Sequence, residues 1–369
     1  MSINKTSDHK YPYNWKLKET EFTKDKGKVF SCFSCGGGST MGYKLAGFDV
    51  IGCNEIDPKM MEVYKHNHNP KYSYLEGIQT FKDRQDLPQE LYNLDILDGS
   101  PPCSSFSMAG NREKDWGKEK KFREGQAEQV LDTLFFDFID LAERLQPKVV
   151  IAENVKGILM GDAKKYCAAI YEAFDKAGYY LDKWLLDASK MGVPQRRERV
   201  FFIAIRKDLS ELLPPGMDMF NNMPGLNLEF NEFGIAFGEF RTEHGLKTDT
   251  YREELMQYRI PSDKCLNDIS LRKDNKMSGF TSMIYYDNQI CPTVTSHGYD
   301  YRDYDGFKAS ELDYCIAQTF PEDYNFNGMG SQYVCGMSVP PVMTAQIADR
   351  IHEQWLSKIK ELKKITTFV

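Results

Sequence analysis

The chain has no run of apolar residues long enough to cross a bilayer, although 41% of its 369 residues are hydrophobic. Its first segment, MSINKTSDHKYPYNWKLKE, is polar and aromatic and lacks the apolar core of a secretory signal. Charged residues make up 27% of the chain, as in an ordinary globular protein. These features predict a cytoplasmic protein that has no membrane partner.

Closely spaced cysteine pairs are also scarce. Nine cysteines are spread along the chain, and only Cys32 and Cys35 form a close pair. An odd and dispersed set argues against a disulfide scaffold. A structural zinc ion normally takes four ligands, and the remaining close donors, His66 and His68, are better explained by a helix end. The sequence therefore predicts no metal site.

An excess of basic residues is missing as well. The formal net charge is −7 and the isoelectric point is near 5.6. A dedicated nucleic-acid binder usually has a basic face, but a local cationic groove can serve instead. Overall charge therefore neither indicates nor excludes a nucleic-acid substrate.

Apolar stretches alternate with helical patterns in the first part of the chain. The apolar stretches include KVFSC at residue 28 and residues 49–55, 93–103, 147–155 and 199–206, and the clearest helical patterns are residues 127–146 and 164–178. This alternation predicts an α/β fold with an open, doubly wound, mostly parallel sheet. In such sheets ligands bind beyond the carboxyl ends of the strands.

The alternation stops after Arg206, which suggests three parts. Residues 1–206 are predicted to form a catalytic domain with an N-terminal extension over residues 1–27. Residues 207–327, with weak periodicity and many turn-forming residues, are predicted to form a second, smaller, irregular or β domain. Residues 328–369 regain a helical pattern and are predicted to return to the catalytic domain.

A glycine-rich turn and a distant carboxylate suggest a nucleoside cofactor. The segment CGGGS follows the first apolar stretch, and Glu55 lies about twenty residues on, at the end of the second. Such a carboxylate can accept both hydroxyls of a ribose. The same layout serves NAD, FAD and S-adenosylmethionine, and a plain tight turn is the alternative.

Cys103 follows a strand and a Pro-Pro pair in DGSPPCSSFSMAG. The two prolines stiffen the chain and would hold the thiol in one place. A small buried apolar residue is the common role of cysteine. The polar loop after Cys103 could instead stabilise a thiolate, which favours a nucleophile.

Two further segments place charged side chains near strand ends. Glu153 closes the apolar run IAENVKG, where burial without a partner is costly, so a role as proton donor or as a helix cap is expected. In GVPQRRERVFFIAIR, Gln195, Arg197 and Arg199 alternate and would face one side of an extended segment. Arg196 and Glu198 would face the other side, and a solvated strand edge is the alternative interpretation.

Taken in order, the segments FSCGGGS, NEID, SPPCSSFS, ENVKG and QRRER resemble the motifs of the DNA (cytosine-5)-methyltransferase family of bacteria and phages. CPTVTS and GMSVPP resemble the last two motifs of that family. The resemblance extends from about Lys28 to the C-terminal helical segment and breaks in the variable middle region. Several motifs in the order of the family indicate that family more specifically than any single motif does.

The resemblance implies a Rossmann-like S-adenosylmethionine-dependent methyltransferase that acts on C5 of a flipped-out cytosine in duplex DNA. Cys103 would be the nucleophile that adds to C6, Glu153 the acid that engages the ring, and Arg197 a contact to the target base. The residues implied for cofactor binding are Phe33, Gly36, Gly37, Gly38, Glu55, Ile56, Ile78, Ser100, Pro102, Ser338 and Val339. Those implied for substrate or DNA binding are Gln195, Arg199, Ser107 and Gly110.

The chain departs from the family pattern at several positions. Ser31 stands where an acid is usual, and Cys35 stands where a glycine is usual. Residues 77–79, Gly-Ile-Gln, replace Gly-Asp-Ile, and Met337 replaces an asparagine. These changes concern the expected cofactor contacts and leave Cys103 and the other catalytic positions unchanged.

Three other functions fit parts of the sequence. An RNA (tRNA) cytosine-5 methyltransferase would use the same motifs, a catalytically idle regulatory homologue would need neither thiol nor acid, and a nicotinamide oxidoreductase would explain only the glycines and Glu55. The implied partners are double-stranded DNA and, in a restriction-modification pair, a cognate restriction endonuclease. A monomer located in the cytoplasm at the nucleoid is expected. The cationic candidates for target recognition are Arg241, Lys247, Arg252, Arg259, Arg272, Lys273 and Lys276.

Overall fold

The computed structural model describes residues 9–102, 119–120, 129–130, 133–161, 163–216, 223–247, 251–277 and 282–367. Cys103, Ser107 and Gly110 lie outside these ranges, as does most of the polar segment that follows Cys103. Within the described ranges, no helix combines the length and apolarity that a membrane span requires.

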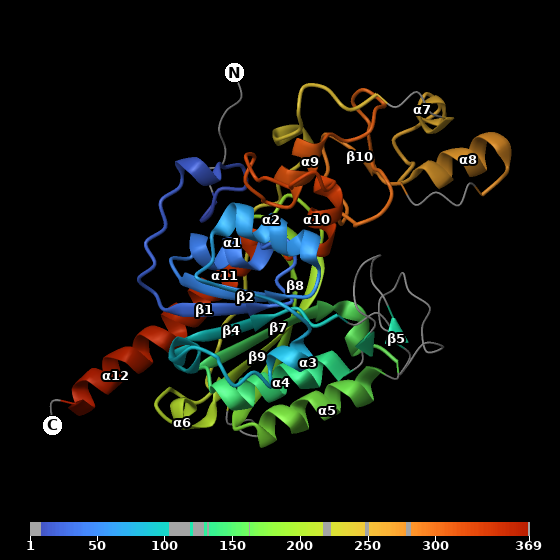
Figure 1. Ribbon diagram of the computed structural model, residues 1–369. Coiled ribbons are helices and arrows are strands. Elements are labelled where there is room, and N and C mark those ends of the chain that lie inside the picture. Colours follow the sequence, from blue (N-terminus) through green and yellow to red (C-terminus); the bar gives the residue numbers. More distant parts are fainter. Residues whose placement is uncertain are drawn as a thin grey trace. The chain divides into compact units, whose positions relative to one another are not determined.

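The chain folds into two compact units, each assembled from segments that are distant in sequence (Figure 1). The sheet unit comprises Phe22–Leu186, Glu198–Glu229 and Thr344–Val369, and the small unit comprises Met1–Glu21, Asp187–Arg197 and Phe230–Met343. The predicted boundaries after residues 206 and 327 do not coincide with these segments. Contacts between residues far apart in the chain decide the grouping, and local composition does not report such contacts.

The sheet unit contains a seven-stranded sheet in the order β3-β2-β1-β4-β7-β9-β8. The strands are β1 (Lys28–Cys32), β2 (Asp49–Glu55), β3 (Tyr72–Leu75), β4 (Ile96–Gly99), β7 (Val149–Val155), β8 (Tyr179–Asp187) and β9 (Glu198–Arg206). The pairs β1–β2, β1–β4, β2–β3 and β4–β7 are parallel, whereas β9 runs antiparallel to β7. The predicted mostly parallel α/β fold is confirmed.

Helices cover both faces of this sheet, as a doubly wound fold requires. Helices α1 (Gly38–Leu45) and α2 (Pro58–His68) lie over one face, and α3 (Ile78–Phe81), α4 (Leu134–Leu145) and α5 (Ala163–Lys176) lie over the other (Figure 1). The short helix α6 (Lys207–Ser210) follows β9, and η8 (His352–Leu356) and α12 (Ser357–Thr367) end the unit. Two-residue strands β5 (Glu119–Lys120) and β6 (Gln129–Val130) pair with each other antiparallel.

Local sequence signals explain why α2 begins where it does. Asp57 caps the helix by accepting the backbone N–H groups of Lys59 at 2.8 Å and Met60 at 3.3 Å. Pro58 takes the first helical position, where its missing N–H costs nothing. Asn69 ends the helix in the left-handed conformation.

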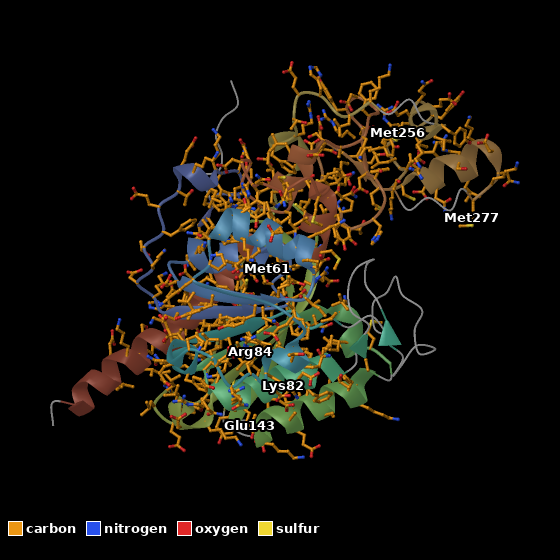
Figure 2. The ribbon with its side chains drawn as sticks, viewed as in Figure 1. Met61, Lys82, Arg84, Glu143, Met256 and Met277 are labelled. Carbon is orange, nitrogen blue, oxygen red and sulfur yellow. The ribbon has the colours of Figure 1, made fainter. Side chains whose placement is uncertain are left out.

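Different side chains pack against the two faces of the sheet (Figure 2). On one face, Met61 of α2 packs with Cys53 of β2 in a small buried cluster. On the other face, α4 contributes Phe135 and Phe138 to the main core, and Lys82 after α3 pairs with Asp137 of α4 at 2.9 Å. The sheet is therefore buried on both sides. Sheets of this kind bind their ligands at the carboxyl ends of the strands.

The small unit is irregular, as predicted, and its described strands are only two residues long. Its elements are η2 (Leu17–Glu19), η6 (Ala188–Lys190), η7 (Phe237–Glu239), α7 (Tyr251–Met256), α8 (Leu266–Asp274), β10 (Ile284–Tyr285), β11 (Tyr301–Arg302), α9 (Glu311–Ala317) and α10 (Ser331–Met337), and α11 (Pro341–Ile351) begins in it. The N-terminal extension is part of this unit. The Trp15 indole donates to the Thr319 carbonyl at 3.0 Å, and the Leu17 N–H donates to Asp323 at 2.6 Å.

Candidate active site

Backbone N–H groups of the turn between β1 and α1 and of the two residues after β2 hold the carboxylate of Glu55 in a fixed position. Oε2 of Glu55 accepts the N–H of Cys35 at 2.7 Å, and Oε1 accepts the N–H groups of Ile56 and Asp57 at 2.9 Å each. Burial raises the pKa of Glu55, and the three N–H donors oppose that shift. The carboxylate is therefore oriented before any ligand arrives, as an acceptor for ribose hydroxyls would need to be.

The same turn contains residues in left-handed backbone conformations. Gly37 has φ 87°, which glycine adopts without strain, whereas Phe33 and Cys35 both have φ 50°. A side chain in this region costs about 1–2 kcal/mol. Cys35 therefore takes a strained conformation at the position where the resembling family usually has glycine.

The other predicted cofactor residues are distributed over both units. Ile78 opens α3 and is 2% exposed within the main core. Gly36, Gly37 and Gly38 are buried, and the half-buried members of this set are Phe33, Ile56, Ser100 and Pro102. Ser338 and Val339 are buried in the small unit.

Glu153 lies in β7 and is paired with an arginine from the adjacent strand. Arg199 is near the start of β9, and its Nε lies 2.9 Å from Oε1 of Glu153. Both side chains are largely buried, at 17% and 13% exposed for Arg199 and Glu153. Burial lowers the pKa of Arg199, and the charge of Glu153 opposes this shift. The sequence put Arg199 among the residues for substrate or DNA binding, whereas in the structure it is the cation beside Glu153.

Asn154, the residue after Glu153, anchors the Pro-Pro turn. Its side-chain N–H group donates to the carbonyl of Pro101 at 3.1 Å, and its Oδ1 accepts the N–H of Val155 at 2.9 Å. The contact ties the carboxyl end of β7 to the chain two residues before Cys103. Sequence reasoning missed Asn154, although it stands inside the quoted ENV segment.

The predicted alternation around Arg197 is confirmed by burial. Gln195 and Arg197 are 0% and 2% exposed, whereas Arg196 and Glu198 are exposed. Within the small unit, Arg197 donates to three backbone carbonyl oxygens, those of Val294 at 2.9 Å, Gly336 at 2.9 Å and Ser338 at 3.0 Å. Its guanidinium therefore joins the CPTVTS and GMSVPP segments.

The side chain of Gln195 is held by Ala317, Gln318 and Val294. Its Nε2 donates to the Ala317 carbonyl at 2.8 Å and to the side chain of Gln318, and its Oε1 accepts the N–H of Val294 at 3.0 Å. Gln318 in turn donates to the Ser338 carbonyl at 2.7 Å. No sequence signal showed that Gln318 bridges the QRRER and GMSVPP segments.

Comparison with known proteins identifies the family. The sequence model described as "C-5 cytosine-specific DNA methylase" matches residues 27–353. The chain belongs to this family. The predicted resemblance to bacterial and phage DNA cytosine-5 methyltransferases is thereby confirmed.

Individual relatives cover the chain to different extents. The chain is 37% identical over 184 residues to Type II methyltransferase M.FnuDI of Fusobacterium nucleatum, which is 50% of this chain and 48% of that protein. It is 28% identical over 340 residues to Type II methyltransferase M1.HphI of Haemophilus parahaemolyticus, which is 86% of this chain and 85% of that protein. The chain thus spans only about half the length of M.FnuDI and of M.NgoPII of Neisseria gonorrhoeae.

Solved structures share the fold. A putative DNA modification methyltransferase encoded within an Escherichia coli prophage has a TM-score of 0.61 and 21% identity, and the match covers 89% of this chain and 99% of that one. A DNMT2 variant of Spodoptera frugiperda has a TM-score of 0.57 and 17% identity, with 88% and 99% covered. At these identities the likeness shows the Rossmann-like fold of this methylase family and nothing finer.

Several candidate target-recognition cations already have acidic or aromatic neighbours in the small unit. Arg259 pairs with Asp303 at 2.9 Å, and Arg272 pairs with Asp263 at 2.6 Å. Arg241 pairs with Asp287 at 2.9 Å and also stacks on Tyr304, with its guanidinium carbon 3.4 Å from the ring centroid. A role in DNA binding remains a prediction for all seven cations.

Proposed function

We propose that the protein transfers the methyl group of S-adenosylmethionine to C5 of a flipped-out cytosine in a specific duplex DNA sequence. The observation that carries the proposal is the buried Glu153–Arg199 pair on β7 and β9. Beside it, Asn154 anchors the Pro-Pro turn that leads to Cys103. Membership of the cytosine-5 methylase family supports the assignment of cytosine.

The cofactor-binding role is supported by the turn after β1. Glu55 is fixed by three backbone N–H groups and fits the ribose hydroxyls of a nucleoside. When bound, S-adenosylmethionine supplies an electrophilic methyl group. The residues proposed to hold it are Phe33, Gly36, Gly37, Gly38, Glu55, Ile56, Ile78, Ser100, Pro102, Ser338 and Val339.

Cys103 and Glu153 are proposed to make cytosine C5 reactive. The thiolate of Cys103 adds to C6 of the ring, and the protonated form of Glu153 donates its proton to N3, which leaves C5 electron-rich. Oε1 of Glu153 pairs with Arg199, so Oε2 is the oxygen proposed to meet the base. After methylation, a base from solvent, water or hydroxide, takes the C5 proton. The C6–S bond then breaks, Cys103 leaves as a thiolate, and N3 returns its proton to Glu153, which restores the ring.

The remaining residues are proposed to position the site or to bind the substrate. Arg197 is proposed to steady the site and contact the base, and Gln195 to support it through its bonds to residues 317 and 318. Arg199, Ser107 and Gly110 are proposed to meet the flipped base or the DNA. A cognate restriction endonuclease, a monomeric state and a cytoplasmic location at the nucleoid remain predictions.

Methyl transfer to defined substrates tests the proposal. Purified protein is incubated with S-adenosylmethionine labelled in the methyl group and with either duplex DNA or tRNA. We expect label in DNA, and bisulfite sequencing of DNA from expressing cells should show 5-methylcytosine at one recognition sequence. Label in tRNA alone would assign the RNA activity, and label in neither would overturn the proposal.

A further inference from the structure

Asp98 is a buried carboxylate that the proposed chemistry does not use. It lies in β4 and is 4% exposed. Its oxygens accept hydrogen bonds from three hydroxyl groups, those of Ser31 at 2.8 Å, Ser39 at 2.9 Å and Tyr43 at 3.0 Å. All three donors are neutral, so they stabilise the charge without cancelling it.

The three donors place Asp98 beside the turn proposed for the cofactor. Ser31 lies in β1 directly opposite Asp98, two residues before Phe33. Ser39 lies in the first turn of α1, the helix that begins where the glycine turn ends. The carboxylate is therefore enclosed by β1, β4 and α1, at the strand ends where a doubly wound sheet binds its ligand.

Among the residues that the structure describes, no cation pairs with the charge of Asp98. Among the ion pairs of the described ranges, none includes Asp98, whereas Glu153 has Arg199. Burial, together with the charge of Glu153, raises the pKa of Asp98 to about 6 in spite of the three hydrogen bonds. Asp98 is therefore ionised at neutral pH, and an uncompensated buried charge is costly. A cationic ligand beside it would recover that cost.

We propose that Asp98 makes the cofactor site selective for positive charge, so that it favours S-adenosylmethionine over its product. The inference rests on the proposed function. S-adenosylmethionine has a sulfonium and an ammonium group, and the sulfur of S-adenosylhomocysteine is neutral after the methyl group has left. Asp98 attracts both cations of the first compound and only the ammonium of the second, so it favours exchange of product for fresh cofactor.

The test measures ligand charge selectivity in solution. Isothermal titration calorimetry compares three probes: S-adenosylmethionine, S-adenosylhomocysteine, and 5′-methylthioadenosine, which has neither cation. In Asp98→Asn we expect affinity for S-adenosylmethionine to fall about tenfold or more, affinity for the product to fall less, and affinity for 5′-methylthioadenosine to stay unchanged. The matched control is Asp95→Asn, which removes a carboxylate from the residue before β4, where it pairs with Lys148, and should leave all three affinities unchanged.

Three results decide between the alternatives. An equal loss of affinity for all three probes would show that Asp98 has a purely structural role. No loss of affinity for any probe would show that the charge of Asp98 does not affect ligand binding. Either result overturns the inference. Asp98→Ser, which puts a hydroxyl among the three hydroxyls, gives the same comparison if the asparagine variant does not fold. Failure of the wild-type protein to bind S-adenosylmethionine at all would instead overturn the proposed function.

Discussion

Replacing Asp98 with asparagine should stabilise the protein at neutral pH, although it is expected to weaken cofactor binding. Folding raises the pKa of this carboxyl from an ordinary 3.8 to about 6. Between these values the folded state holds a proton that the unfolded chain has lost, so rising pH removes stability until the folded pKa is passed. Two pKa units correspond to about 3 kcal/mol at pH 7.5, and about half of that cost is already present at pH 5.

Asparagine avoids this cost because it does not ionise. The surrounding hydroxyl groups can accept from its amide as well as donate to it, so the site can keep its hydrogen bonds. The expected free energy of unfolding of Asp98→Asn exceeds that of the wild type by up to about 3 kcal/mol at pH 7.5 and by about half as much at pH 5.

Urea denaturation measures this difference. Trp184 in β8 and Trp355 in η8 belong to the sheet unit and report its unfolding by fluorescence. Low protein concentration is needed at pH 5 because the isoelectric point is near 5.6. Asp95→Asn, which breaks the pair with Lys148, should lower stability instead. The reasoning is refuted if Asp98→Asn is less stable than the wild type at pH 7.5, or if its advantage is the same at both pH values.

Three further substitutions have defined outcomes. Cys35→Gly should raise the free energy of unfolding by about 1 kcal/mol, because glycine adopts φ 50° without strain, and a lower urea midpoint would contradict this. Arg199→Lys should slow methyl transfer about tenfold or more, because lysine lacks the planar guanidinium that meets Glu153, and the circular dichroism spectrum should stay unchanged. The control is Arg196→Lys at an exposed position, which should keep the wild-type rate. Equal rates for the two variants would exclude a role for the ion pair. Gln318→Ala should cost about 2 kcal/mol, since it removes two buried side-chain hydrogen bonds, one with Gln195 and one with the Ser338 carbonyl. An unchanged urea midpoint would show that the bridge is dispensable.

The strand framework could be predicted because it depends on local patterns. Near-continuous apolar runs marked β7 and β9, and the alternation of residues 195–199 correctly indicated which side chains are buried. The glycines and Glu55 marked the turn after β1 because a cofactor turn needs both close backbone approach and a distant carboxylate.

Contacts between distant segments could not be predicted in the same way. The sequence made Arg197 the contact to the target base and put Arg199 among the residues for substrate or DNA binding. Only the antiparallel register of β9 against β7 places Arg199 on Glu153. The donors of Asp98 come from β1 and α1, and no spacing in the sequence links them. The N-terminal extension was assigned to the catalytic domain, but Trp15 and Leu17 attach it to residues 319–323 of the small unit.

Covalent trapping most directly tests whether this family member attacks cytosine through Cys103. The protein is incubated with S-adenosylmethionine and duplex DNA that contains its recognition sequence with 5-fluorocytosine as the target base, where fluorine at C5 prevents release of the enzyme. Wild-type protein should form a denaturation-resistant adduct with the DNA, and Cys103→Ser should form none. Absence of an adduct from the wild type, or an adduct that persists in Cys103→Ser, would contradict the proposed chemistry.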